Sequence, residues 1–137
     1  MAEAPTTLRF RLSNEPDATC KLRAALTHVA EEVDLPEEER FELKVAATEA
    51  FTNAIKGAPG EHAVEVAIRG SDAAVDVEVV DRGRFALQMR NDEGLEAESG
   101  RGIPLMLALV DEVEFAAIGD GTRVRMRKRA RHRRPHL

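Results

Sequence analysis

Two neighbouring segments that alternate strictly between apolar and polar residues constrain the fold of this chain more than any other feature. They are HAVEVAIRG, residues 62–70, and AAVDVEVVD, residues 73–81. Alternation with a period of two is typical of strands with one buried face, and Gly70, Ser71 and Asp72 at their junction indicate a hairpin. The chain is therefore expected to contain an antiparallel sheet with one face covered by another layer.

Two helical segments can provide that layer. Residues 15–36 repeat apolar side chains at helical spacing, and the pattern stops at Pro36. A second helix is expected from about 37 to 56. Proline loses no hydrogen bond in a first helical turn, and the acidic residues that follow it favour the positive end of the helix dipole.

The other segments predict three strands and one more helix. The strands are expected in residues 6–14, through Val113 and Phe115, and in 121–129, and the helix from Gly102 to about Val110. Residues 82–99 lack periodicity and are long for a connection, which is typical of a lid or a disordered loop. The order β, α, α, β, β, loop, α, β, β predicts an α+β fold, a two-layer α/β sandwich with the helices on one face of a mostly antiparallel sheet.

Composition fits one globular domain, which we expect to span residues 1–128, with a basic tail at 129–137. The chain has 137 residues, 43% of them hydrophobic and 33% charged. It has no basic start followed by an apolar run, and no apolar stretch near ~18 residues, so we expect neither export nor membrane insertion and place the protein in the cytoplasm. The single cysteine, Cys20, cannot form an internal disulfide and is interpreted as a buried small side chain.

Charge is distributed unevenly along the chain. Residues 123–137 contain eight Lys/Arg and no acid, so a net charge of −5 leaves −13 on residues 1–122. Such a run can be an arm that binds nucleic acid or an acidic partner. We favour a final strand followed by a solvated tail without direct nucleic-acid binding, because no aromatic residue is interleaved to stack on bases and the acidic body would repel a phosphate backbone.

Glu49 and Asn53 stand one turn apart in the second predicted helix. An isolated polar pair at this spacing usually lies on a solvated helix face. Asparagine is nevertheless a poor mid-helix residue, because its side chain competes for backbone hydrogen bonds. A carboxylate and an amide oxygen at this spacing are also the groups that a magnesium-phosphate site uses, which makes this pair a candidate for such a site.

Two further stretches carry candidate binding residues. Asp81 ends an apolar strand and could accept a hydrogen bond from an amino group, and Gly83 would let the backbone approach a flat ligand. A strand that simply ends in a turn explains this stretch equally well. Gly100 and Gly102 open a helix whose free amides favour phosphate, although a flexible hinge is the alternative.

Taken together and in this order, these stretches resemble the nucleotide-binding boxes of the histidine-kinase-like ATPases. Within that superfamily they are similar to the anti-sigma-factor serine kinases of the RsbW type, and the similarity covers nearly the whole chain. The segments that carry it are TEAFTNAI, DRG, SGRGIPLMLALVDEVEF and GTRVRMRKR. The last two are the most specific.

The resemblance implies a role for each candidate residue. Asn53 would hold Mg²⁺ on the phosphates of ATP, and Glu49 would act as the general base. Asp81 would accept from the adenine amino group, with Gly83 beside it and Thr122 nearby. Gly100 and Gly102 would line the lid next to the phosphates.

The resemblance also implies partners. Proteins of this type sequester a sigma factor and exchange it for an anti-anti-sigma protein of the STAS type, which they phosphorylate on serine. It further implies a homodimer, a role in stress-response transcription regulation, and an arginine at Arg23 that contacts the partner.

The chain departs from the family at two positions. It has Gly57 where histidine is frequent and Phe85 where a second glycine follows the Asp-x-Gly box. The second hypothesis is therefore a binding module of the same fold that sequesters a partner with weak or no kinase activity. The ATP-binding half of a sensor histidine kinase ranks third, because no phosphoacceptor helix precedes the domain.

Overall fold

The computed structural model describes residues 6–57, 63–81, 102–119 and 121–131. Its strands form one five-stranded sheet in the order β1-β2-β3-β5-β4, and every neighbouring pair is antiparallel. The strands are β1 (Thr6–Leu12), β2 (Val64–Ser71), β3 (Ala74–Asp81), β4 (Glu112–Ile118) and β5 (Gly121–Arg129).

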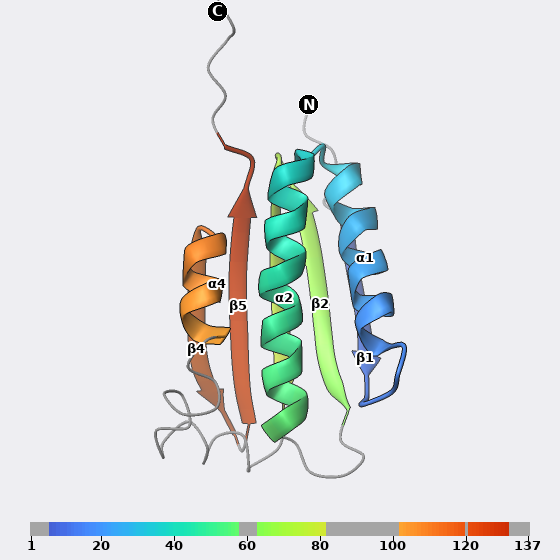
Figure 1. Cartoon of the computed structure of the whole chain (residues 1–137), viewed down its shortest axis with the longest axis vertical. Helices are drawn as coiled ribbons and strands as arrows, with labels where there is room; N and C mark the ends of the chain where they lie inside the picture. Colours follow the sequence, from blue (N-terminus) through green and yellow to red (C-terminus); the bar gives the residue numbers. More distant parts are fainter. Residues whose placement is uncertain (1–5, 58–62, 82–101, 120, 132–137) are drawn as a thin grey trace, which may run out of the picture.

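The three helices of the described residues lie on one face of this sheet (Figure 1). They are α1 (Ala18–Glu32), α2 (Glu37–Gly57) and α4 (Gly102–Leu109). The central helix α2 packs against both α1 and α4 as well as against the sheet. The predicted two-layer α+β sandwich is confirmed, and the predicted ends of α2 are correct to within one residue. Among the described residues, no helix is both long enough and apolar enough to cross a membrane.

The core lies between the two layers. On β3, the alternation predicted from the sequence buries Val75, Val77 and Val79 against the helices. On α2, Leu43 and Ala47 are completely buried on the opposing side. Burying a valine or leucine side chain stabilises a fold by roughly 1.5–3 kcal/mol, so this interface is what holds the helical layer on the sheet.

Helix α1 also buries one stripe, which includes Ala18, Leu22 and Leu26. Cys20 lies off that stripe and is exposed, so the prediction that it is buried was wrong. Cys20 comes two residues after Ala18, and over two residues the helix turns by about 200°. The Cys20 side chain therefore lies on nearly the opposite side of the helix.

The hairpin turn differs from the expected one. Gly70 and Ser71 belong to β2, and the turn consists of Asp72 and Ala73 with φ of 48° and 60°. Two positive φ values suit a two-residue turn that matches the strand twist. Gly70 is needed for packing instead, because an added Cβ would lie 2.7 Å from a methyl carbon of Val29 on α1.

The outer face of the sheet explains most of the basic run. Arg127 makes a bidentate ion pair with Asp76 on β3, with Nε–Oδ1 and Nη2–Oδ2 distances of 2.7 and 2.9 Å, and these bonds raise the pKa of Arg127. The other outward-facing arginines of β5 follow the same rule, pairing Arg123 with Glu78, Arg125 with Glu114 and Arg129 with Glu112. The predicted final strand is thus confirmed, and its positive charge is balanced by acids of the neighbouring strands.

Candidate functional site

One end of the molecule holds the predicted site residues Glu49, Asn53, Asp81, Gly102 and Thr122, which the structure describes. The last turn of α2, the end of β3, the start of β5 and the start of α4 all lie at the lower end in Figure 1. This arrangement follows from chain direction, because α2 and β3 run toward this end whereas β5 and α4 run away from it.

Asp81 and Thr122 lie side by side within this end. They are opposite each other in the antiparallel pair β3–β5, and both side chains continue the inward-facing phase of their strands. Asp81 is 2% exposed and Thr122 is 6% exposed. The Thr122 hydroxyl has no hydrogen-bond partner among the described residues. A buried carboxylate beside a buried hydroxyl suits a ligand that offers a donor and an acceptor, as an aminated heterocycle does.

Glu49 and Asn53 lie on the flank of α2 that faces β5 and α4. That flank is identified by Glu42, whose carboxylate contacts Lys128 of β5, and residues seven and eleven positions later return to the same side. From Glu42 to Asn53 the helix advances about 17 Å. From Lys128 back to Thr122 the strand spans about 20 Å, so Asn53 lies close to the level of Thr122.

The side chains of Glu49 and Asn53 are half-buried. Neither forms a hydrogen bond or an ion pair with another described residue. The neighbouring hydroxyl of Thr48 is buried and likewise has no partner within the described part of the chain. A carboxylate and an amide oxygen free of cations fit the oxygen ligands that Mg²⁺ takes alongside phosphates and water. Glu49 and Asn53 are therefore the candidate oxygen ligands for a metal ion at this end of the molecule.

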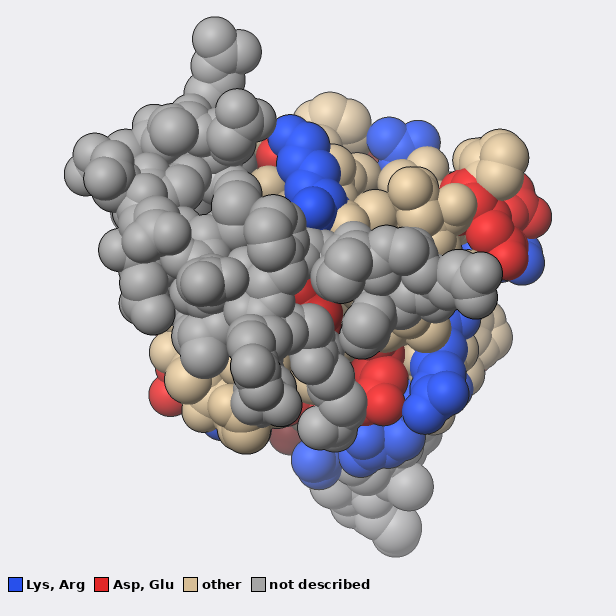
Figure 2. All heavy atoms as spheres, turned by 90° about the horizontal axis from the view of Figure 1, so that it is seen from below, with Lys and Arg blue, Asp and Glu red and all other residues tan. Residues whose placement is uncertain are grey.

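The remaining predicted residues are placed in part. Gly102 begins α4 at this end, and Gly57 ends α2 there, as expected. Gly83 and Gly100 lie outside the described residues, and so does Phe85. Figure 2 views this end directly and shows both acidic and basic side chains at its described surface.

Arg23 lies on α1, apart from the Asp81–Thr122 pair. Its side chain is exposed and has no ion pair with any described residue, and the acidic residue Glu31 on the same helix is paired with Arg40 instead. Arg23 is thus a guanidinium with no assigned role inside the described fold. Helix α1, which carries Arg23, packs mainly against α2, β1 and β2.

Comparison with known proteins identifies the architecture. Residues 12–128 match the family described as the histidine kinase-like ATPase domain. The chain is 32% identical over 145 aligned positions to the serine-protein kinase RsbW of Bacillus pumilus, covering 93% of this chain and 88% of that protein. The chain belongs to the histidine kinase-like ATPase family, as a relative of the RsbW type.

A solved structure supports the same fold. The RsbU and RsbW domains of a Mycobacterium tuberculosis protein superpose on this RsbW-type chain with a TM-score of 0.68 at 21% identity. The match covers 90% of this chain and 32% of the mycobacterial one. The chain thus spans about a third of that larger protein, and the likeness to it concerns the fold.

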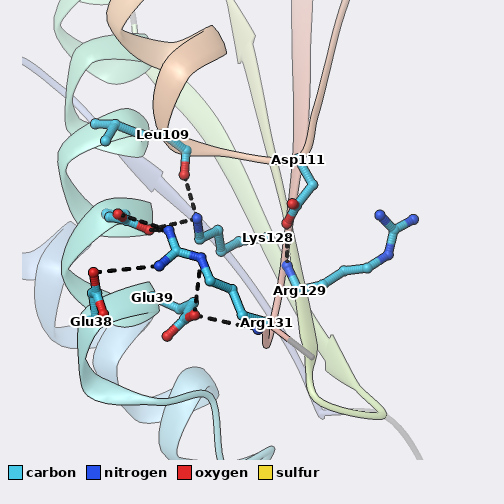
Figure 3. A network of polar contacts seen from close by, with 8 residues as sticks. Glu38, Glu39, Leu109, Asp111, Lys128, Arg129 and Arg131 are labelled. Carbon is cyan, nitrogen blue, oxygen red and sulfur yellow. Dashed lines mark hydrogen bonds and ion pairs between the residues drawn. The ribbon is translucent and has the colours of Figure 1, made fainter. Parts of the chain in front are cut away.

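Sequence reasoning missed one polar cluster of this RsbW-type chain, at the opposite end of α2 (Figure 3). Lys128 is 4% exposed, and its Nζ lies 2.7 Å from Glu42 Oε1 and 2.6 Å from the carbonyl oxygen of Leu109. The sequence does contain a signal for the burial of Lys128. Lys128 alternates with Met126 and Val124, so it lies on the same inward-facing side of β5.

Arg131 completes this cluster. Its guanidinium contacts the carboxylates of Glu38, Glu39 and Glu42. The hydrogen bond from Lys128 is the main cause that lowers the pKa of Glu42, and the nearby charge of Glu42 is the main cause that raises the pKa of Arg131. Arg131, just after β5, is therefore bound to α2. Residues 132–137 of the expected tail lie outside the described residues, so the solvated tail stays a prediction.

Proposed function

We propose that this protein is an ATP-dependent serine/threonine protein kinase that sequesters a sigma factor and phosphorylates a serine of a STAS-domain anti-anti-sigma protein. The observation that carries the proposal is the composition of one end of the fold. There, Asp81 and Thr122 are buried side by side at about the level that Asn53 reaches on α2. The side chains of Glu49 and Asn53 make no bond to a described residue. The proposal is supported by the family match and by the relative from Bacillus pumilus, which is named a serine-protein kinase.

Asp81 and Thr122 would recognise the base of ATP. A carboxylate accepts from the adenine amino group, whereas the threonine hydroxyl can donate to a ring nitrogen or accept from a bound water. Gly83 would lie beside the ring. Burial matters here because a hydrogen bond to a charged acceptor is worth more when water does not compete for it.

Asn53 would hold Mg²⁺ through its side-chain oxygen, and Gly100 and Gly102 would bind the phosphates through backbone amides at the start of α4. The metal, when bound, neutralises charge on the phosphate oxygens. Glu49 would accept the proton of the substrate serine as that hydroxyl oxygen bonds to the γ-phosphorus and the bond to the β,γ-bridging oxygen breaks. The products are phosphoserine and ADP, and most of the rate enhancement comes from positioning and electrostatics.

Arg23 would contact the partner proteins. A planar guanidinium forms two parallel hydrogen bonds to a carboxylate, so its expected counterpart is an acidic side chain on the sigma factor or on the STAS protein. We also propose that the protein acts as a homodimer in the cytoplasm, in transcription regulation during stress.

The proposal is tested by measuring radiolabel transfer from ATP to a candidate STAS-domain protein, with sigma-factor binding measured on the same preparation. Transfer to serine together with sigma binding is expected. Sigma binding without transfer to any STAS protein would favour the partner-sequestering binding module. Gly57→His and Phe85→Gly, which restore the residues usual in the family, would then be the first variants to test.

Arg23→Ala tests the partner surface. It is expected to weaken binding of both partners by about tenfold, the loss of one charge-assisted contact. Arg9→Ala is the matched control, because Arg9 on β1 is also exposed and also makes no ion pair with a described residue. Equal affinities for the two variants would place the interface elsewhere.

A further inference from the structure

Lys128 stands where three elements of the fold meet. It lies on β5, its Nζ donates to the Glu42 carboxylate on α2, and the same ammonium donates to the carbonyl of Leu109, the last residue of α4. Figure 3 shows Lys128 pointing from the strand toward the end of α4. A single buried cation thus connects the central helix, the strand and the short helix.

Helix α4 depends on such a connection. It has eight residues, fewer than a helix needs to be stable alone in water, and its segment GIPLMLAL carries no charge of its own. Met106 anchors it in the core, while Leu105 and Leu107 are exposed. Among the described residues, the bond from Lys128 to Leu109 is the only polar contact between α4 and another element.

The contact is also well matched to a helix end. The last carbonyl groups of a helix have no partner within it, and the dipole there favours a cation. A buried ammonium without such partners would lose its hydration with no compensating interaction. Glu42 offsets that loss, and Nη2 of Arg131 in turn donates to Oε1 and Oε2 of Glu42, at 2.9 and 3.1 Å.

We infer that Lys128 is a positioning residue for the nucleotide site. This inference rests on the proposed function, because α4 begins with Gly102 at the proposed phosphate end and finishes at the Lys128 contact, about 12 Å away along its axis. Fixing Leu109 against Glu42 sets how α4 lies along α2. That alignment determines whether the amides at the start of α4 face the same phosphates as Glu49 and Asn53, which lie further along α2.

The experiment compares Lys128→Met with Lys44→Met. Lys44 is a matched control, because its Nζ also links α2 to a neighbouring helix, at 3.1 Å from Thr27 of α1, but on the flank away from α4. Amide hydrogen exchange of α4 is measured without nucleotide. The Kd for Mg-ATP, kcat and KM are measured at a temperature at which every variant is fully folded.

For Lys128→Met we expect α4 amides to exchange about tenfold faster, the loss of one charge-assisted bond. We expect kcat to fall about 10- to 100-fold, since misplacing reacting groups by an ångström has effects of this size. Lys44→Met should change neither, and Lys128→Arg, which keeps a cation with several donors, should restore much of kcat. If Lys128→Met does not fold, Glu42→Gln replaces it in the comparison with Lys44→Met. The expected changes in α4 exchange and in kcat have the same direction and are smaller.

Equal exchange of α4 in the two methionine variants would overturn the inference. Faster exchange with unchanged Kd and kcat would also overturn it, because α4 would then be held by Lys128 without consequence for the site. Failure of the wild type itself to bind Mg-ATP is a separate result. It would contradict the proposed function, while the exchange measurement, which uses no nucleotide, would still report whether Lys128 holds α4.

Discussion

The two halves of helix α2 carry carboxylates in opposite circumstances. In the first half, Glu39 and Glu42 are matched by Lys128 and Arg131, and Glu39 is 1% exposed. In the second half, Glu49 has no cation and no hydrogen-bond donor among the described residues. Glu42 and Glu49 stand on one helix, seven positions apart. The first is paired with cations of the chain, and the second has no partner among the described residues.

The difference indicates how the fold separates stability from function. Buried carboxylates with internal cations hold elements together, and removing one partner leaves an uncompensated charge. A half-buried carboxylate without an internal partner adds little to stability but retains its capacity to accept a proton. Substitutions in the first half should therefore act on stability first, and those in the second half on chemistry first.

Glu49→Gln should give the largest effect. A positioned general base contributes about 10²- to 10⁴-fold in rate, so phosphorylation of the STAS substrate is expected to fall by that factor while ATP and sigma binding barely change. Single-turnover transfer of labelled phosphate measures it. Glu42→Gln is the matched change on the same flank, and it should lower the free energy of unfolding while reducing the rate far less. Equal rates for Glu49→Gln and wild type would remove Glu49 as the base.

Asp81→Asn is expected to weaken ATP binding by about 10- to 100-fold, because the amide can present a donor where the adenine amino group needs an acceptor. Calorimetric titration with Mg-ATP measures the Kd. Asp76→Asn provides the control, since Asp76 lies on the same strand, faces the opposite side of the sheet and pairs with Arg127. If both variants bind ATP as wild type does, Asp81 is not in the pocket.

Acid should weaken the first half of α2 through Glu42. Its pKa is lowered in the fold from an ordinary 4.5, so it contributes stability that is fully present above pH 4.5 and is lost as the pH falls through the lower folded value. Urea unfolding at several pH values should show wild type more stable than Glu42→Gln by about 1–3 kcal/mol at pH 7. The two stabilities should converge as the pH falls below 4.5. If the difference in unfolding free energy between the two proteins did not change with pH, the charge of Glu42 would not be what Lys128 and Arg131 bind.

The smallest effect is expected on the outer face of the sheet. Arg127 is 39% exposed at its side chain and pairs with Asp76, so Arg127→Met should cost about 1 kcal/mol or less, and less still in high salt. Thermal unfolding without added salt and with roughly 0.5 M salt measures this difference, because salt screens the attraction between exposed charges. A loss as large as that of Lys128→Met would show that the outer ion pairs carry as much stability as the buried cluster.

Much of the fold could be predicted because its signals are local. Strand alternation and helical spacing specify each element of the described chain, and Pro36 marks the start of α2. What failed depends on tertiary contacts. Gly70 was assigned to a turn, whereas its role is to let α1 approach the sheet. The burial of Lys128 requires knowing which face of β5 is covered.

The candidate site was predicted in the same uneven way. Asp81 and Thr122 were expected to lie near each other, and the strand register places them opposite one another. The roles given to Glu49 and Asn53 remain predictions, because a helix position shows which flank a side chain occupies and not what binds there. The link from α4 back to Glu42 had no motif to reveal it, since its partners come from three distant segments.

The central claim is that the end of the fold containing Asp81, Thr122, Glu49 and Asn53 binds Mg-ATP, and a thermal-shift titration tests it most directly. At a concentration 100 times Kd, binding adds roughly 2.7 kcal/mol of stability. For a domain of this size that raises Tm by about 10 °C. The account predicts this rise for the wild type and for Asp76→Asn, and a clearly smaller one for Asp81→Asn at the same concentration. No rise in the wild type at millimolar Mg-ATP, or an equal rise in Asp81→Asn, would contradict it.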